Sequence, residues 1–261
     1  GSARSPTRAN IEEGLRWLAE DAQPGDALFL HFSGHGAQQV DPNGYEEDGM
    51  HETILPVDFK QAGMITDDDV NNLVVQPLPQ HVRLTVIMDC CHSGTGLDLP
   101  YIQKSGQWRE ETNPFHVLAD VQLFSGCEDE ATSADAMSEF GRAGGAMTTA
   151  FCEVMQSNPS MRYPELMARL NMMMQQRGFT QRPQLSSSQA FDFDRPFDLE
   201  NAVPNSNRVL GRTVRKKFKP QPRVKAQMRE ILGSDLAASV GLSAALSVGA
   251  SMVMSAANWF F

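Results

Sequence analysis

The sequence predicts an α/β fold in which a mostly parallel central sheet carries helices on both faces. Short apolar segments alternate with amphipathic helical segments, the pattern of strands joined by crossover helices. One apolar segment, RLTVIMD at 83–89, has no polar alternation, as expected of a central strand covered on both faces. A chain of 261 residues, 41% of them hydrophobic, can bury one substantial core.

The first elements are a helix, a strand and a loop. A helix is expected over 7–22, with Thr7 or Asn10 as its cap. Its apolar residues recur at helical spacing and are Ile11, Leu15, Leu18 and Ala22. A short apolar strand follows at 27–32, and the glycine-bearing segment 36–50 is expected to be a polar loop.

The middle of the chain predicts a short strand at 52–59 and a helix at 67–75. Three carboxylates open that helix, where they suit the positive end of its dipole. After the central strand 83–89, the segment 100–115 is expected to be a long polar connection.

The last elements are a strand at 116–126, helices at 144–156 and 163–179, and an extended segment at 182–188. Gly178 is expected to close the second of these helices. Sheets of this kind place their sites in the loops at the carboxyl ends of the strands.

The charge of the chain is unevenly distributed. The net charge is −10, whereas the segment from Arg212 onward carries eight basic and two acidic residues, so that residues 1–211 carry −16. An acidic body attracts cations or basic substrates and argues against nucleic acid as a partner. Four cysteines without a pairing pattern, and the lack of a signal-like apolar start, predict a cytoplasmic monomer without disulfides.

The C-terminal part is expected to be a basic linker at 208–235 and an uncharged helix at 236–261. That helix is long enough to span a hydrocarbon core of ~30 Å, and basic residues in front of it are typical of a segment facing anionic lipid. Regularly spaced serines make it only weakly apolar. A membrane segment, a helix docking on the body or a partner, and a disordered tail remain alternatives.

Two strand ends carry the residues of a cysteine–histidine pair. HFSGHG at 31–36 follows one strand and DCCHSG at 89–94 follows another. A cysteine nucleophile needs a base near it, usually imidazole, and glycines beside a histidine let a backbone N–H approach a reacting carbonyl. A single cysteine at a strand end is more often a packing residue, but the paired pattern favours catalysis. The run CCH is a poor zinc site, because neighbouring strand residues point to opposite faces.

Five motifs together resemble a type I metacaspase, a cysteine peptidase of caspase-like fold. In chain order they are HFSGHG, LPVDF, ITDDDV, DCCHSGTGLDLPY and SGCEDEATSAD, and the likeness covers residues 7–200. It implies a catalytic domain over 1–207, with a large-subunit-like region at 7–116 and a small-subunit-like region at 117–207. It also implies an endopeptidase that cuts protein or peptide substrates after Arg or Lys and is usually activated by calcium.

The resemblance assigns roles at the two strand ends. His35 would be the general base and Cys91 the nucleophile, while the amides of Gly36 and Cys91 would form the oxyanion hole. Ser33 and Asp89 would form the pocket for the basic side chain, in agreement with an acidic body. On the residues alone, Asp89 could instead cap a turn at the strand end.

The resemblance also maps a calcium site onto Asp67, Asp68 and Asp98. Calcium prefers several hard carboxylate oxygens, although on the residues alone DDD is more often a solvated helix start. His51 stands where the family has an aspartate that contributes to calcium binding, and imidazole is a poor calcium ligand. Nearby carboxylates could compensate; they are Glu46, Glu47, Asp48 and Glu52.

Two further departures concern Ala131, which replaces a common glutamine without a derivable consequence, and the start of the chain. The family begins with an apolar strand and an acidic pocket loop, whereas this chain begins at the following helix, so the sheet is expected to lack that strand and expose an edge. A metacaspase-like regulatory or scaffold protein is therefore the alternative to an enzyme. A flavodoxin-like binding module is disfavoured, because no phosphate-cradling glycine loop is present.

Overall fold

The computed structural model describes residues 5–90, 96–127, 145–179, 182–205, 210–214, 216–219 and 258–260. Its main sheet has the strand order β12-β1-β5-β9-β10-β6-β7. These strands are β1 (Ala27–Ser33), β5 (Arg83–Asp89), β6 (Tyr101–Lys104), β7 (Gln107–Glu110), β9 (Asp120–Cys127), β10 (Arg182–Ser187) and β12 (Asn258–Phe260). The central strands β1, β5 and β9 are parallel, whereas β12, β10, β6 and β7 pair antiparallel with their neighbours.

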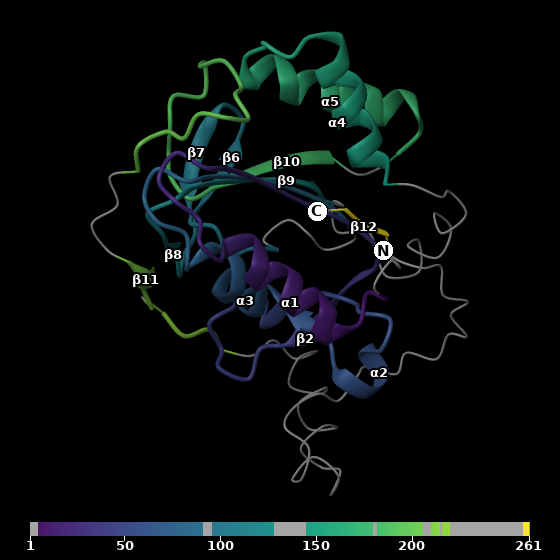
Figure 1. The fold of residues 1–261 in the computed structure, drawn as a ribbon, viewed down its shortest axis with the longest axis vertical. Helices are drawn as coiled ribbons and strands as arrows, with labels where there is room; N and C mark the ends of the chain where they lie inside the picture. The colour runs from purple at the N-terminus through teal and green to yellow at the C-terminus, as the bar shows by residue number, and fades with distance from the viewer. Residues whose placement is uncertain are drawn as a thin grey trace, which may run out of the picture.

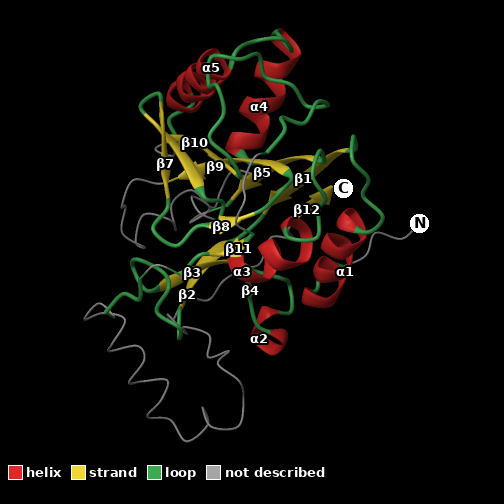
Figure 2. Ribbon diagram, turned by 90° about the vertical axis from the view of Figure 1, so that its left-hand side faces the viewer, coloured by secondary structure: helices red, strands yellow, loops and turns green. Residues whose placement is uncertain are grey.

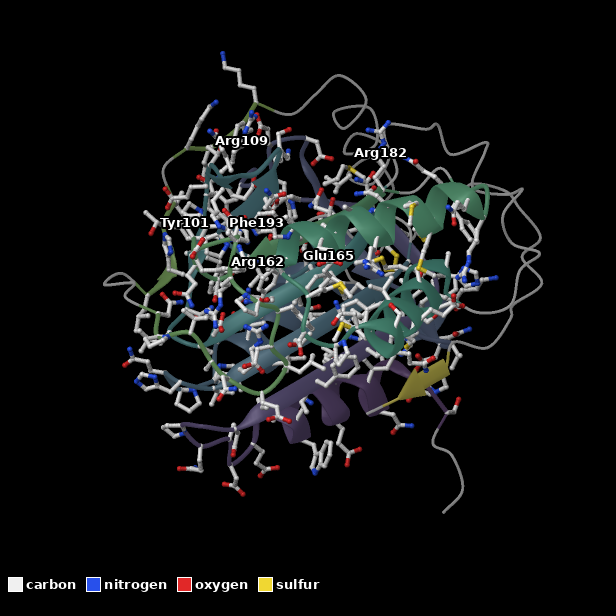
Figure 3. The ribbon with its side chains drawn as sticks, turned by 90° about the horizontal axis from the view of Figure 1, so that it is seen from above. Tyr101, Arg109, Arg162, Glu165, Arg182 and Phe193 are labelled. Atoms are coloured by element: carbon white, nitrogen blue, oxygen red, sulfur yellow. The ribbon has the colours of Figure 1, made fainter. Side chains whose placement is uncertain are left out.

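Helices cover both faces of this sheet, with α4 and α5 on one face and α1 and α3 on the other (Figure 1). Seen from above, α4 and α5 lie over the sheet (Figure 3). The helices are α1 (Arg8–Ala19), α2 (Phe59–Ala62), α3 (Asp67–Val70), the π-helical turn η1 (Asn71–Val75), α4 (Ala146–Ser157) and α5 (Tyr163–Gln176). The predicted α/β class with a parallel centre is thus confirmed, and the antiparallel flanks are a feature that the sequence pattern did not indicate.

The two faces bury two separate hydrophobic clusters. Side chains of α1, η1 and one face of β5, such as Leu15, Val74 and Val86, form the first. The second lies under α4 and α5 and includes Phe124, Phe151 and Leu170. Because alternate side chains of β5 enter opposite clusters, all seven of its residues are buried, as its apolar run predicts.

The predicted helix boundaries hold where capping residues define them. The side chain of Thr7 accepts a hydrogen bond from the amide of Asn10 at the start of α1, and Ile11, Leu15 and Ala19 face the core. Thr66 and Asp69 form a reciprocal capping box at the start of α3.

Two segments that were expected to be loops form strands. Gly36–Val40 is β2, which pairs with β3 (Met50–Ile54), and β3 pairs with β4 (Ile65–Thr66). This small sheet lies on the same side of the main sheet as α1 and α3 (Figure 2). The prediction of a polar loop over 36–50 was therefore wrong at its start. The polar residues of β2 are half-buried, and their backbone groups pair with those of β3.

The segment 100–115 is likewise not a structureless connection. It holds the β6–β7 hairpin, which turns at Ser105 and Gly106, both with positive φ (52° and 82°). This turn suits a tight two-residue hairpin, because its twist matches that of the strands. Trp108 fixes the hairpin onto the second cluster by packing 4.8 Å from the ring of Phe191.

The C-terminal segments differ from the predicted basic linker and helix. Residues 211–212 form β11 (Gly211–Arg212), which pairs with β8 (Phe115–His116) on the body of the protein. Asn258–Phe260, expected as the end of a helix, instead form β12 along the outer edge of β1, where unpaired backbone groups accept a strand. The remainder of the predicted helix, 236–257, lies outside the described residues, and none of the described helices is long and apolar enough to cross a membrane.

Candidate active site and acidic cluster

Parallel pairing brings the two sequence-predicted strand ends together. Strands β1 and β5 run in register, so that Ser33 lies opposite Asp89 at their carboxyl ends. The amide of Gly34 donates to the carbonyl of Asp89 over 3.4 Å, and His35 and Gly36 follow directly. Cys91, predicted as the nucleophile, lies outside the described residues.

His35 is held beside this edge by the backbone. Its carbonyl accepts a hydrogen bond from the amide of Leu55 (3.0 Å), and Gly36 starts β2 opposite Ile54. Burial lowers the pKa of His35 below its ordinary value, because the charged imidazolium loses solvation. The imidazole is therefore neutral at pH 7, the form in which it can accept a proton.

Of the two adjacent cysteines, Cys90 lies among the described residues. Cys90 is buried, 6% exposed, and belongs to the first hydrophobic cluster together with Met88. Its side chain thus continues the core-facing alternation of β5, in which Ile87 belongs to the opposite cluster. Cys90 packs as a core residue.

Asp89 caps a helix from a distance. Its Oδ2 accepts a hydrogen bond from the amide of Thr148 (2.7 Å) at the start of α4, 59 residues along the chain. Burial raises the pKa of Asp89, and the hydrogen bonds from Thr148 oppose that rise. A methyl group on Gly145 would come within 1.9 Å of Asp89 Oδ2, so only glycine fits there. The capping role considered from the sequence is thus real, but it serves a helix and not a local turn.

His31 is a neighbour of Asp89 that the sequence analysis missed. Its Nε2 lies 2.8 Å from Thr148 Oγ1, and burial lowers its pKa while the charge of Asp89 opposes that change. Its position two residues before Ser33 on β1, on the same face of the strand, was the available signal.

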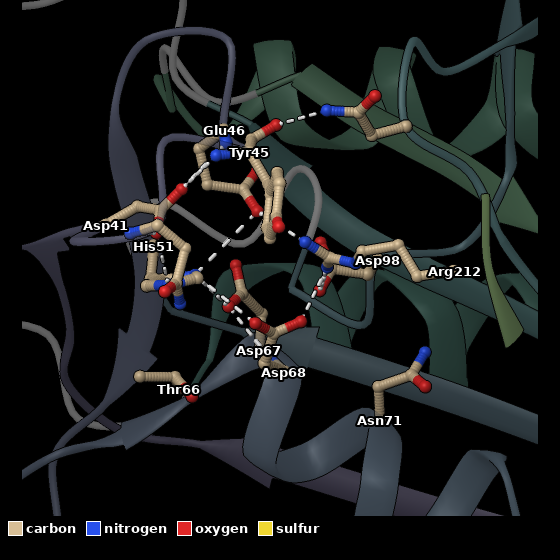
Figure 4. A network of polar contacts seen from close by, with 12 residues as sticks. Asp41, Tyr45, Glu46, His51, Thr66, Asp67, Asp68, Asn71, Asp98 and Arg212 are labelled. Carbon is tan, nitrogen blue, oxygen red and sulfur yellow. Dashed lines mark hydrogen bonds and ion pairs between the residues drawn. The ribbon is translucent and has the colours of Figure 1, made fainter. Parts of the chain in front are cut away.

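The predicted metal residues Asp67, Asp68 and Asp98 gather in one acidic cluster, which also contains Asp41 and Glu46 (Figure 4). Asp67 starts α3, whereas Asp98 lies in the loop before β6 with a positive φ of 48°. Asp41 was missed by the sequence analysis. It accepts the amides of Asn43, Tyr45 and Glu46, and so folds its loop around its own carboxylate.

His51 lies inside the acidic cluster. Its Nδ1 is 3.1 Å from Asp67 Oδ1, and its Nε2 is 3.4 Å from Asp41 Oδ1. Burial alone would lower its pKa, but hydrogen bonds and charge from Asp41 and Asp67 raise the pKa of His51 to about 11. His51 is therefore a cation that pairs with two buried carboxylates.

Arg212 enters the acidic cluster from the side opposite His51 (Figure 4). Its Nη2 contacts Asp68 Oδ1 at 2.5 Å and Asp98 Oδ2 at 2.7 Å. Its Nη1 lies 3.3 Å from Glu46 Oε1. No sequence signal identified Arg212, because it comes from the segment expected to be a linker.

The acidic cluster has the chemistry for a calcium ion but does not fit one as it stands. Carboxylate oxygens are the ligands that calcium prefers. Both oxygens of Asp67, however, accept hydrogen bonds, which come from His51, Glu52 and Asp68. Asp68 Oδ1 and Asp98 Oδ2 are paired with the guanidinium of Arg212. Among the described residues, no group of three or more His, Cys, Asp or Glu side chains is arranged to hold a metal ion.

A small pocket joins the acidic cluster to the end of β5. Its lining includes Glu52 and Asp67 as well as Cys90 and Gly96.

The parallel centre, the helices on both faces and the two adjoining strand ends define a caspase-like α/β protein. Residues 1–100 match the family model described as metacaspase, peptidase C14 domain. The chain is 41% identical over 217 residues to Metacaspase-1 of Plasmodium falciparum, covering 81% of this chain and 35% of that protein. It is 42% identical over 214 residues to Metacaspase-2 of Trypanosoma brucei brucei, covering 76% of this chain and 61% of that protein. The resemblance to metacaspases seen in the motifs is thus confirmed by a family model and by relatives about 40% identical.

A solved structure supports the fold independently. The protein GSU0716 from Geobacter sulfurreducens superposes with a TM-score of 0.52 at 24% identity, covering 74% of this chain and 79% of that one. At this identity the likeness concerns the fold alone. The chain spans between about a third and three fifths of the length of the two metacaspases above.

Proposed function

We propose that the chain is a cysteine endopeptidase that cleaves after Arg or Lys, with Cys91 as nucleophile and His35 as general base. The observation that carries this proposal is the register of β1 and β5, which sets Ser33 opposite Asp89 and leads both strands into the predicted catalytic segments. Similarity to metacaspases supports the same reaction class.

The proposed reaction uses the neutral imidazole of His35. His35 takes the thiol proton of Cys91, and the thiolate sulfur bonds to the substrate carbonyl carbon. The amides of Gly36 and Cys91 stabilise the resulting oxyanion. The C–N bond then breaks as His35 returns the proton to the leaving amine, and water hydrolyses the thioester with His35 again as base.

Substrate choice is proposed to depend on Asp89 with Ser33. A buried carboxylate is a strong partner for a guanidinium or ammonium group, and residues 1–211 are acidic as a whole. Calcium responsiveness through Asp67, Asp68 and Asp98 stays a prediction, because these carboxylates are paired within the chain and do not fit an ion as they stand.

The nucleophile is tested by comparing the two cysteines. Cys91→Ala is expected to abolish cleavage of a fluorogenic Arg peptide, whereas Cys90→Ala should retain most of it because Cys90 is a core residue. Circular dichroism of both variants provides the folding control. Turnover by Cys91→Ala at the parent rate would reject the assignment.

A regulatory or scaffold role is the second candidate, and the occupation of the acidic cluster by His51 and Arg212 favours it. In that case the parent chain would turn over no Arg or Lys peptide at any calcium concentration. Measuring the parent across a calcium series therefore separates the two candidates.

A further inference from the structure

We propose that Arg212 serves as the built-in cation of the acidic cluster, and that the segments 210–214 and 216–219 form a clamp which a divalent cation must displace. The clamp itself rests on contacts within the chain, and only the identity of the competing ion, calcium, rests on the proposed function. The chain would then carry its own competitor for the site.

The first support is the way in which Arg212 is seated. One guanidinium bridges Glu46, Asp68 and Asp98, which come from two different loops and the start of α3. The side chain is only 12% exposed and lies over the ring of Phe115, with Cζ 5.4 Å from the ring centre. A planar fork of donors against several carboxylates is a strong and directional arrangement.

The second support is that the backbone around Arg212 is fixed on both sides. β11 pairs with β8, and the amide of Thr213 donates to the carbonyl of Pro114 (2.9 Å). Further along, the amide of Phe218 donates to the carbonyl of Gly44 (2.9 Å). The clamp thus reaches from β8 to the loop that supplies Glu46.

The side-chain amide of Asn113 links the clamp at Lys216 to the loop at Tyr45. Its Nδ2 donates to the carbonyl of Tyr45 (2.7 Å) and to that of Lys216 (2.9 Å), and its Oδ1 accepts the amide of Lys216 (3.2 Å). The ammonium group of Lys217 adds a contact 4.8 Å from the ring centre of Tyr45. The clamp is therefore fastened to the same loop, 41–46, that folds around Asp41.

The third support is that the clamp and a divalent cation need the same oxygens. Calcium takes six to eight oxygen ligands at about 2.3–2.6 Å. Asp67 is committed to His51 and two backbone amides, so an ion must draw on Asp68 and Asp98, which Arg212 now holds. A guanidinium and a divalent cation at one set of oxygens repel each other, and the two are mutually exclusive.

The test uses the full chain with Cys91→Ala, which prevents turnover, and compares it with Arg212→Gln, Arg212→Lys and Arg169→Gln in the same background. Arg169 is the matched control, because it makes an exposed ion pair with Glu165 on α5, away from the clamp. Calcium affinity is measured by calorimetry. Hydrogen exchange of the Thr213 and Phe218 amides reports whether the clamp is closed.

We expect Arg212→Gln to bind calcium on the order of tenfold or more tightly than its parent, since charge-assisted contacts to the carboxylates are removed. Arg212→Lys should fall between, and Arg169→Gln should match the parent. Saturating calcium should speed exchange of both amides in the parent. Arg212→Gln should already exchange them faster without calcium, a readout that needs no metal.

Equal calcium affinity in Arg212→Gln and parent would overturn the competition, as would calcium binding that leaves both amides protected. Failure of both chains to bind calcium would also overturn it. Cleavage of an Arg peptide by the chain with Cys91 intact is measured separately, so that loss of the clamp proposal and loss of the peptidase proposal are distinguishable.

Discussion

At the scale of single residues, burial separates side chains that look alike in sequence. Cys90 packs in the core, and the three adjacent aspartates have three different partners: Asp67 binds His51, Asp68 binds Arg212 and Asp69 caps α3. The sequence predicted that these carboxylates would gather, because they start a helix. It could not predict which oxygens remain accessible, since the partners come from distant parts of the chain.

The burial of His35 predicts how peptide cleavage depends on pH. Because burial lowers its pKa below the ordinary value of about 6.5, His35 should stay neutral at pH 7 and protonate only as the pH falls through its lowered pKa. Peptide cleavage should therefore be retained at pH 6.5 and decline below it. Folding stability should decrease in the same direction, since below pH 6.5 the unfolded chain binds the proton more readily.

The measurement is the imidazole NMR titration of His35 in Cys91→Ala, with His35→Asn to assign the signal. The pH profile of kcat/KM in the parent should follow the same ionisation. A His35 titration at or above 6.5 would contradict the expectation.

At the scale of elements, the sequence predicted those whose signal is local and missed those that depend on pairing. α1, β1, β5, α4 and α5 follow from caps and apolar periodicity, and their observed bounds differ from expectation by a few residues at most. β2 and the β6–β7 hairpin were missed because polar residues such as Gln38, Gln39 and Gln103 give these strands no clear apolar pattern. β2 forms through backbone pairing with β3. The hairpin forms through pairing of β6 with β7 across the turn at Ser105 and Gly106. Arg212 was missed because it lies 144 residues beyond Asp68.

The close approach of Asp89, at the end of β5, to Gly145, at the start of α4, predicts the effect of a substitution there. Gly145 has an ordinary φ of −63°, so Gly145→Ala should act only through the collision of its methyl group with Asp89. Moving Asp89 off the amide of Thr148 should cost about 1–3 kcal/mol of stability and lower kcat/KM for Arg peptides.

A double-mutant cycle provides the control. Combining Gly145→Ala with Asp89→Ala removes the two closest colliding atoms, Asp89 Oδ2 and Cγ, and leaves only Cβ at 2.8 Å. The two single losses of unfolding free energy should therefore add up to more than that of the double variant. Additive losses in urea unfolding would show that the close approach has no energetic weight.

At the scale of the whole molecule, one buried polar network ties the sheet to the helical layer above it. Arg83 is 1% exposed and pairs with Asp120 (2.7 Å), and it also contacts Gln122 and the hydroxyl of Tyr163 on α5. Arg83 is the first residue of β5, whereas the proposed site lies at the carboxyl end of that strand, beyond Asp89. The chain therefore stabilises its layers away from the edge where the site is proposed.

Asp120→Ala tests this network. Removing the carboxylate leaves the Arg83 guanidinium buried without its ion-pair partner, so the free energy of unfolding should fall by about 3–5 kcal/mol. Glu165→Ala, which breaks an exposed pair with Arg169, should change it by less than about 1 kcal/mol. Urea denaturation compares them, and equal losses in the two variants would mean that the buried pair has no special weight.

The seating of Arg212 also has a consequence for how the protein is made. A ribosome extends the chain from its N-terminus, so every carboxylate of the acidic cluster is synthesised before its guanidinium partner, and 114 positions separate Asp98 from Arg212. Throughout that interval, charge neutralisation must come from His51 and from ions of the surrounding fluid. The nascent chain thus meets ambient cations at this cluster before its own arginine has emerged.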